Sequence, residues 1–285
     1  TDHWSATGRA ASTGECEMSE TSAALTRSGT NYSLKDDIRA YWTKRAETFD
    51  LSWGHKIRTD SELEAWCGII ADHGAHRTGD RALELASGTG EVTRALIRMG
   101  CTVDAIDLCD TMIERAKSKH IGSAVRFHLG DAENTMMPDD TYDLVVTRHL
   151  VWTLTDPASA LSDWLRMLKP GRRVVIIDGD WVNASWRARV LKRLSAWLDR
   201  WKGQPALWDQ AAHQNIMDRL PYGKGLSLEA VTTLLRRAGF VDIRSGDLSV
   251  IRRHQWRSAS WSERLRMLAT YDGNTFVVSA AKPSA

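Results

Sequence analysis

The sequence has little of what builds extracellular, membrane-spanning or strongly charged proteins. Its 285 residues include four cysteines, which form no C-x-x-C pair and no zinc-ligand spacing. We therefore expect free thiols in a reducing compartment. No apolar run approaches the roughly 20 residues that a membrane-spanning helix requires, and residues 1–9 hold no hydrophobic signal core. The formal net charge is only +2, so no nucleic acid or anionic membrane is needed to balance it. These absences predict a cytoplasmic protein.

Tryptophan, by contrast, is abundant, with 13 residues in the chain. None of them lies between Cys67 and Val151; they gather before and after that stretch. Large aromatic side chains pack the interfaces of long helices. Aromatic faces on a lid also bind aromatic or cationic substrates. Both explanations remain open, and different tryptophans can satisfy different ones.

One stretch at residues 82–90, A-L-E-L-A-S-G-T-G, organises the chain. Its apolar first half predicts a strand, its second half a small-residue turn, and residues 91–97 then take helical spacing. A strand, a glycine-rich turn and a helix place main-chain N–H groups and a helix N-terminus beside a ligand at the carboxyl edge of a parallel sheet. Gly88 and Gly90 allow the main chain to pass close to that ligand.

The neighbouring residues indicate which ligand this is. A dinucleotide-binding loop would have a third glycine where this chain has Thr93. The next predicted strand, residues 102–107, ends in Asp107, and a carboxylate there binds both hydroxyls of a ribose. With Glu84 four residues before Gly88, the sequence resembles the class I S-adenosylmethionine-dependent methyltransferases, whose first motif is acid-x-G-x-G-x-G. Ala86 stands where that family usually has its first glycine.

The resemblance continues in order along the chain. A predicted third strand, residues 125–129, is followed by Gly130 and Asp131, and a fourth covers residues 144–147. An amphipathic helix at 157–168, a Lys-Pro-Gly turn at 169–171 and a strand at 173–178 complete the match. The resemblance implies an α/β Rossmann-like sheet of seven mostly parallel strands, the last one antiparallel, with helices on both faces. It also implies N-terminal helices and a helical lid, with S-adenosylmethionine as cofactor and S-adenosylhomocysteine as product.

We predict five segments from the composition and this resemblance. Residues 1–30 form a flexible extension, 31–75 an N-terminal helical cap, 76–180 the cofactor-binding core, 181–226 a Trp-rich lid, and 227–285 the rest of the core. Helices are expected at 37–46, at 61–73 with Asp60 or Ser61 as cap, and at 185–202. Residues 204–222 look irregular. A helix at 228–238, with Ser227 as cap and Gly239 as stop, precedes strands at 241–244 and 274–279.

The resemblance further implies a set of cofactor-binding residues from the cap, the glycine loop and the strand ends. Asp131 would bind the adenine amino group, although a turn that caps something local is the alternative. Tyr41 and Met112 are equally compatible with ordinary core packing. The cofactor-binding residues are Tyr41, Arg45, Glu84, Ala86, Ser87, Gly88, Gly90, Asp107, Leu108, Met112, Gly130, Asp131, Ala132 and Arg148.

Methyl transfer from a sulfonium is an in-line displacement, so positioning supplies much of the catalysis. A base is needed only when the acceptor must lose a proton. His149 and Asp180 follow the fourth and fifth strands and are the catalytic candidates. The alternative for His149 is a hydrogen bond that fixes its loop. The predicted substrate-binding residues are Trp152, Trp181, Trp186 and Tyr222, with His55, His213, His254 and Tyr32 as weaker candidates for the site.

Missing motifs narrow the acceptor. After the fourth strand there is no Asn/Asp-Pro-Pro-aromatic motif, which is typical of enzymes that methylate the amino groups of nucleic acids. The chain has no Pro-Cys pair to provide the nucleophile for cytosine methylation. No cluster of metal-binding residues is evident either. The basic stretch 187–200 is a solvated helix face or a phosphate-binding surface. We expect the methyl acceptor to be a small molecule of secondary metabolism, indole-like or phenolic. We expect the protein to bind no nucleic acid, membrane or metal, and a homodimer is one of its possible quaternary states. The alternatives are an RNA or protein methyltransferase and a non-catalytic S-adenosylmethionine-binding protein.

Overall fold

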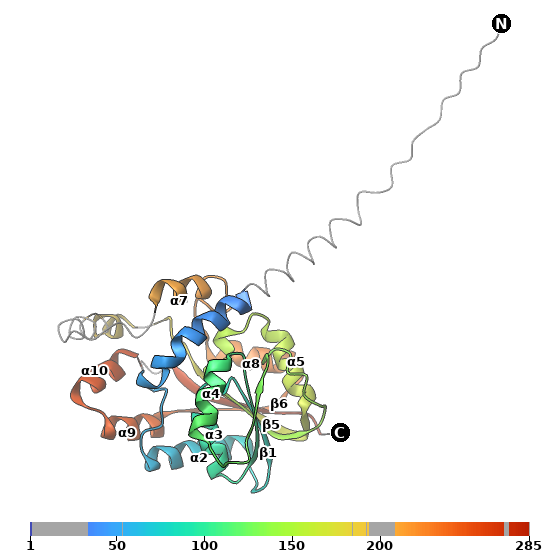
Figure 1. Ribbon diagram of the computed structural model, residues 1–285, viewed down its shortest axis with the longest axis horizontal. Coiled ribbons are helices and arrows are strands. Elements are labelled where there is room, and N and C mark those ends of the chain that lie inside the picture. Colours follow the sequence, from blue (N-terminus) through green and yellow to red (C-terminus); the bar gives the residue numbers. More distant parts are fainter. Residues whose placement is uncertain are drawn as a thin grey trace.

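A seven-stranded sheet forms the centre of the molecule (Figure 1). The computed structural model describes residues 34–52, 54–183, 185–191, 209–270 and 274–284, together with Thr1 and Arg193. The strands are β1 (Arg81–Leu85), β2 (Thr102–Asp107), β3 (Arg126–Leu129), β4 (Tyr142–Arg148), β5 (Leu168–Gly179), β6 (Val241–Asp247) and β7 (Thr275–Ala281). Their order is β3-β2-β1-β4-β5-β7-β6, and β7 runs antiparallel to both of its neighbours. The predicted fold class is confirmed.

Helices cover both faces of the sheet, which explains why most residues of the central strands β1, β2 and β4 are buried. On one face lie α2 (Asp60–Gly74), α3 (Glu91–Arg98) and α4 (Asp110–Lys119); on the other lie α5 (Pro157–Met167) and α8 (Leu228–Arg237). Leu83 and Leu85 of β1 pack in the core beneath α5 and α8, whereas Ala82 packs beneath α2 and α3. Alternate residues of one strand thus enter two separate cores.

Residues 34–45 are helical and continue into the 3-10 helix η1 (Ala46–Leu51). Leu34 and Ile38 pack against Ile216, Met217 and Leu220, at the end of α7 (Gln210–Met217) and just beyond it. Figure 1 shows this helical segment and α7 side by side above the sheet. Two segments about 180 residues apart in sequence therefore build one cover.

Several predicted details are wrong. The cap of α2 is Thr59, whose hydroxyl accepts a hydrogen bond from Glu62 N, and not Asp60 or Ser61. The Lys-Pro-Gly segment is a bulge inside β5 rather than a turn before it, because the register with β4 shifts there. Within 204–222, the supposedly irregular stretch, α7 is a regular helix capped by Asp209. Two further helices, α9 (Ser249–Ser258) and α10 (Trp261–Thr270), were not predicted.

Other expectations hold or lie outside the described residues. Ser227 caps α8 as predicted, by accepting from Ala230 N. Cys67, Cys101 and Cys109 are free thiols. Among the described residues, no helix combines the length and the apolarity that crossing a bilayer requires. The proposed N-terminal extension and most of the predicted helix at 185–202 fall outside the described part. Of that predicted helix, residues 186–191 and 193 are described as helix.

Candidate functional site

A cavity of about 320 Å³ lies at the carboxyl ends of β1, β2, β3 and β4, roofed by the helical segment 34–45 and η1. This is the edge at which parallel α/β sheets bind ligands. Roof, strand ends and the segment after β5 all contribute side chains. The residues lining it include Lys35, Tyr41, Trp42, Arg45, Phe49, His55, Glu84, Ala86, Ser87, Gly88, Asp107, Leu108, Met112, Gly130, Asp131, Ala132, Glu133, Arg148, His149, Trp152, Trp181 and His213.

The glycine loop after β1 is built on left-handed backbone. Ala86, Gly88 and Gly90 have φ of 55°, 55° and 85°. The left-handed angle at Ala86 explains why the resembling family favours glycine at that position. Gly90 is the N-cap of α3 and does not line the cavity. A Cβ on Gly90 would lie 2.7 Å from His120 Nε2, so this glycine allows α4 to approach the loop.

Asp107, the last residue of β2, faces the glycine loop. Its Oδ2 accepts from Gly88 N at 2.7 Å and its Oδ1 from Cys109 N at 2.8 Å. Burial raises the pKa of Asp107 to about 6, although these main-chain donors oppose the shift. The main-chain N–H of Leu108 is also hydrogen-bonded to this carboxylate. Its two oxygens offer about four lone-pair positions, so acceptor capacity remains for a ribose hydroxyl.

Asp131, after β3, is tied to the roof. Its Oδ2 pairs with Lys35 Nζ at 2.6 Å, and the same amine lies 2.8 Å from Glu133. Glu133 in turn accepts from Thr155 N at 2.5 Å. The amine of Lys35 thus joins the roof to the loops after β3 and β4. The sequence did not single out Lys35, because nothing local distinguishes it from any other helix-surface lysine.

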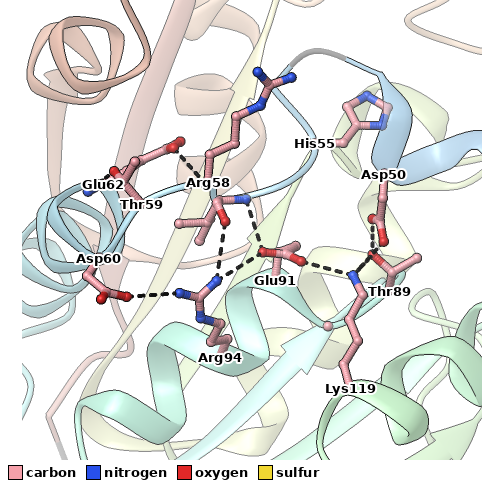
Figure 2. A network of polar contacts seen from close by, with 12 residues as sticks. Asp50, His55, Arg58, Thr59, Asp60, Glu62, Thr89, Glu91, Arg94 and Lys119 are labelled. Atoms are coloured by element: carbon pink, nitrogen blue, oxygen red, sulfur yellow. Dashed lines mark hydrogen bonds and ion pairs between the residues drawn. The ribbon is translucent and has the colours of Figure 1, made fainter. Parts of the chain in front are cut away.

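A second set of contacts ties η1 and the chain after it to α3 and α4 (Figure 2). Glu91, at the start of α3, accepts from Ile57 N at 3.0 Å and from Lys119 Nζ at 2.9 Å. Lys119 also pairs with Asp50 at 2.6 Å, and Thr89 Oγ1 donates to the other oxygen of Asp50 at 2.6 Å. These contacts hold the roof closed over the glycine loop.

Two predicted cofactor residues make mainly internal contacts. The Arg45 guanidinium donates to Thr48 Oγ1 at 2.6 Å and to Ser52 Oγ at 2.5 Å, and so holds the η1 turn. The Glu84 carboxylate accepts from Thr93 Oγ1. Burial raises the pKa of Glu84 to about 8, so this group is mostly protonated at pH 7.

Imidazoles and tryptophans form the other end of the cavity. His149 follows β4 with a φ of 61°, and its N–H donates to Ile177 O at 2.8 Å. Its ring lies 4.8 Å from that of Trp181 and 6.2 Å from that of His55, between centroids. Trp152 lies 5.7 Å from His213 in the same way. This end is aromatic.

The two imidazoles beside Trp181 are uncharged. Burial, followed by the neighbouring Arg148 guanidinium, lowers the pKa of His55 to about 3 and that of His149 well below its usual range. His149 was predicted as a catalytic residue because an ordinary histidine has a pKa close to neutral. In this environment His149 is instead a neutral hydrogen-bonding group and a weak base.

The structure brings most predicted site residues together and leaves five outside the cavity lining, while Tyr32 lies outside the described residues. Beside Gly90, these are Asp180, Trp186, Tyr222 and the weaker candidate His254. The Asp180 carboxylate accepts from the main-chain N–H groups of Val182 and Asn183. Trp186 is 65% exposed, and Tyr222 packs against the core beneath α8. Conversely, His55 and His213, weaker candidates in the sequence, lie in the cavity wall.

Two buried polar atoms show where the site fits a nucleoside cofactor. Ser87 Oγ and Trp152 Nε1 are buried and have no hydrogen-bond partner in the described structure. Both residues line the cavity. Buried polar groups are normally paired, so these two suit a ligand with donors and acceptors along its length. No group of three His, Cys, Asp or Glu side chains suited to a metal occurs among the residues described.

Comparison with known proteins agrees with this geometry. Residues 83–176 match a family described as a methyltransferase domain. The chain is 25% identical over 194 residues to the ubiquinone/menaquinone biosynthesis C-methyltransferase of Desulfotalea psychrophila. The aligned region covers 66% of this chain and 77% of that protein. Seven further curated methyltransferases, with 29–36% identity, match over only 41–48% of their own length.

Solved structures with the same fold include two at low identity. Phosphoethanolamine N-methyltransferase 2 of Haemonchus contortus gives a TM-score of 0.57 at 19% identity, over 84% of this chain and 57% of that one. Geranyl diphosphate C-methyltransferase of Streptomyces coelicolor gives a TM-score of 0.56 at 16% identity. The match covers 87% of this chain and 98% of that one. The methyltransferase-domain match over residues 83–176 and the curated methyltransferase relatives together support a class I S-adenosylmethionine-dependent methyltransferase, and the solved structures share this fold. S-adenosylmethionine is its cofactor.

Proposed function

We propose that this enzyme transfers the methyl group of S-adenosylmethionine to a small, uncharged aromatic molecule inside the roofed cavity. The observation that carries the proposal is the cavity itself, which joins a nucleoside-type end at β2 and β3 to an end walled by Trp152, Trp181 and two neutral imidazoles. A roof fixed by ion pairs covers the space between these ends, which favours a small acceptor over a macromolecule. We place the reaction in the cytoplasm and in secondary metabolism.

At the nucleoside end, the proposed roles follow the contacts. Asp107 binds the ribose hydroxyls, Asp131 and Ala132 meet the adenine, and Leu108 and Met112 pack against it. The main chain from Ala86 to Gly88 passes the methionine portion. When bound, the cofactor supplies an electrophilic methyl group; the protein orients it and keeps water away.

At the acceptor end, His149 holds the acceptor rather than removing its proton. A neutral imidazole accepts or donates one hydrogen bond without charge, which suits a phenol hydroxyl or an indole N–H. Trp152 and Trp181 supply flat faces for an aromatic ring. The curated relatives support a small-molecule acceptor, since the Desulfotalea protein is named for C-methylation in ubiquinone and menaquinone biosynthesis. Structural neighbours were solved with phosphomonomethylethanolamine or geranyl diphosphate, also small molecules.

The test combines binding and turnover. Calorimetry with S-adenosylhomocysteine should show tight binding to the wild type and weakening of tenfold or more in Asp107→Asn, whereas Asp110→Asn, an exposed substitution on α4, should bind as the wild type does. Labelled S-adenosylmethionine is then incubated with a panel of phenols, indoles, primary amines, RNA and peptides. Methylation confined to RNA or peptides, with affinity that falls steeply with salt, would overturn the small-molecule proposal.

A further inference from the structure

Asp178 is a buried carboxylate behind the acceptor end of the cavity, and it does not line the cavity itself. It lies near the end of β5, one strand away from the loop that carries His149. Its Oδ1 accepts from Gly179 N at 2.9 Å and from the indole N–H of Trp181 at 3.2 Å. In the sequence, Asp178 is distinguished only as the last residue of the strand predicted at 173–178.

The other oxygen of Asp178 holds a different element. Oδ2 accepts from Val151 N at 3.0 Å, and the N–H of Trp152 is also hydrogen-bonded to the carboxylate. Val151 and Trp152 belong to the 3-10 turn η2 (Val151–Thr153), which follows β4. One carboxylate therefore connects the two tryptophans of the acceptor end, which come from different strand ends.

An ionised carboxylate is well matched to these four N–H donors, because its two oxygens provide about four lone-pair positions. All four donors are uncharged, and burial raises the pKa of Asp178 to about 7. A protonated acid would turn one oxygen into a donor that faces other donors. An asparagine would do the same at every pH.

We propose that Asp178 is the positioning residue that sets Trp181 and Trp152 at the spacing required by the methyl acceptor. It acts through the two tryptophans and touches neither acceptor nor cofactor. The inference rests on the proposed function, because it assumes that these tryptophans bind the acceptor.

A pH dependence follows. As the pH rises through about 7, Asp178 ionises and gains the capacity to accept all four hydrogen bonds. The other titratable groups nearby are His149 after β4, His55 from the roof and Asp180 on the same segment; β7 contributes Phe276 opposite Asp178. Both imidazoles are uncharged at neutral pH, because burial lowers their pKa values. The acceptor end is therefore ordered above pH 7 and loosened below it.

The test is ¹⁹F NMR of the full chain labelled with 5-fluorotryptophan, with Trp181→Phe used to assign the Trp181 signal. In the wild type this signal should shift with pH with a midpoint near 7. In Asp178→Asn it should be displaced and independent of pH between 6 and 8. The wild-type titration does not depend on Asp178→Asn, so the proposal stays testable if that variant folds poorly.

Asp163→Asn is the matched control. Asp163 also accepts from a main-chain N–H and from a hydroxyl, both of Thr135, but it lies away from the cavity lining. It should leave the Trp181 signal in place. With an acceptor from the panel, Asp178→Asn should raise the acceptor KM about tenfold and leave the S-adenosylmethionine KM unchanged. A static Trp181 signal, or equal effects on both KM values, would overturn the positioning role.

Failure of the proposed function gives a different result. If S-adenosylhomocysteine does not bind the wild-type protein, the methyl-transfer proposal fails while the Trp181 titration still reports on Asp178. If it binds equally to the wild type and Asp178→Asn but Trp181 does not respond, only the positioning role fails.

Discussion

Two residues without glycine's freedom take left-handed backbone at the edge of the cavity, Ala86 after β1 and His149 after β4. Such residues cost free energy and persist where the surrounding structure holds them. At His149 the main-chain bond to Ile177 O and the ring contact with Trp181 supply that constraint. At Ala86 the chain has alanine where the family usually has glycine. The backbone strain of this left-handed alanine can be measured by substitution.

Ala86→Gly should stabilise the protein slightly. Relief of the left-handed conformation gains about 1–2 kcal/mol, and the greater freedom of glycine in the unfolded chain offsets about 0.4–1 kcal/mol. We expect a gain of about 0.5–1 kcal/mol in the free energy of unfolding, measured by urea denaturation. Ala95→Gly, in the middle of α3, should cost about 1 kcal/mol instead. Destabilisation at both positions would show that Ala86 is not strained.

The ribose-binding role proposed for Asp107 predicts a pH dependence of cofactor binding. The carboxylate is ionised above a pKa of about 6 and can then accept hydrogen bonds from hydroxyls; protonation below that value removes this capacity. The affinity for S-adenosylhomocysteine should therefore fall as the pH drops through 6, as measured by calorimetry from pH 5 to 8. In Asp107→Asn the affinity should be low throughout and lack this midpoint. An equal pH profile in both proteins would exclude Asp107 as its origin.

At the scale of elements, the roof depends on contacts with other segments to keep its place in the site. The helical segment 34–45 and η1 pack through a small apolar cluster with α7 and through ion pairs to the sheet edge. The Lys119 contacts in Figure 2 join α4, α3 and η1 at one amine. Their removal should let the roof open more often without disturbing the sheet.

Lys119→Met is expected to speed the release of S-adenosylhomocysteine. A partly buried ion pair of this kind contributes about 1 kcal/mol, which corresponds to roughly a fivefold change in rate or affinity. Stopped-flow displacement measures the dissociation rate. Lys117→Met is the control, because Lys117 lies on the same helix and pairs with the exposed Glu114, away from the roof. Equal rates in both variants would show that the Lys119 contacts do not hold the roof.

At the scale of the whole molecule, the tryptophans separate into groups with different tasks. Trp164 on α5 is fully buried, and its indole N–H donates to Ala132 O at 2.7 Å, beneath the loop that lines the cavity. Trp152 and Trp181 face the cavity, and Trp186 lies on the surface. Core packing therefore accounts for Trp164. Substrate binding is the role proposed for Trp152 and Trp181.

Trp164→Leu should destabilise the fold by about 3 kcal/mol, because it leaves a large gap in the core and an unpaired buried carbonyl. Trp186→Leu should change the free energy of unfolding by less than about 0.5 kcal/mol, since its side chain is largely solvated. Thermal and urea denaturation measure both. A comparable loss in the two variants would mean that Trp186 is buried against another part of the chain or another copy.

The sequence predicted elements well where one element carries its own signal. Strand β1, the glycine loop and α3 were expected within a residue or two, because apolar runs and turn residues are local. Thr59 was missed as a cap although Glu62 follows it at capping-box spacing. The helices α9 and α10 were both missed. In α9 the apolar residues are few, and the partner of Gln255, Glu62, lies far away in sequence.

What the sequence alone determined is the class of fold and the nucleoside end of the site, since both depend on short motifs at the ends of consecutive strands. Only the tertiary structure decided which residues share the acceptor end and in what protonation state. His55, His149, Trp181 and His213 come from four separate segments, and the pKa values of the two imidazoles beside Trp181 depend on burial. Burial and long-range contact arise only when the sheet brings its strand ends to one edge, so no local pattern encodes them.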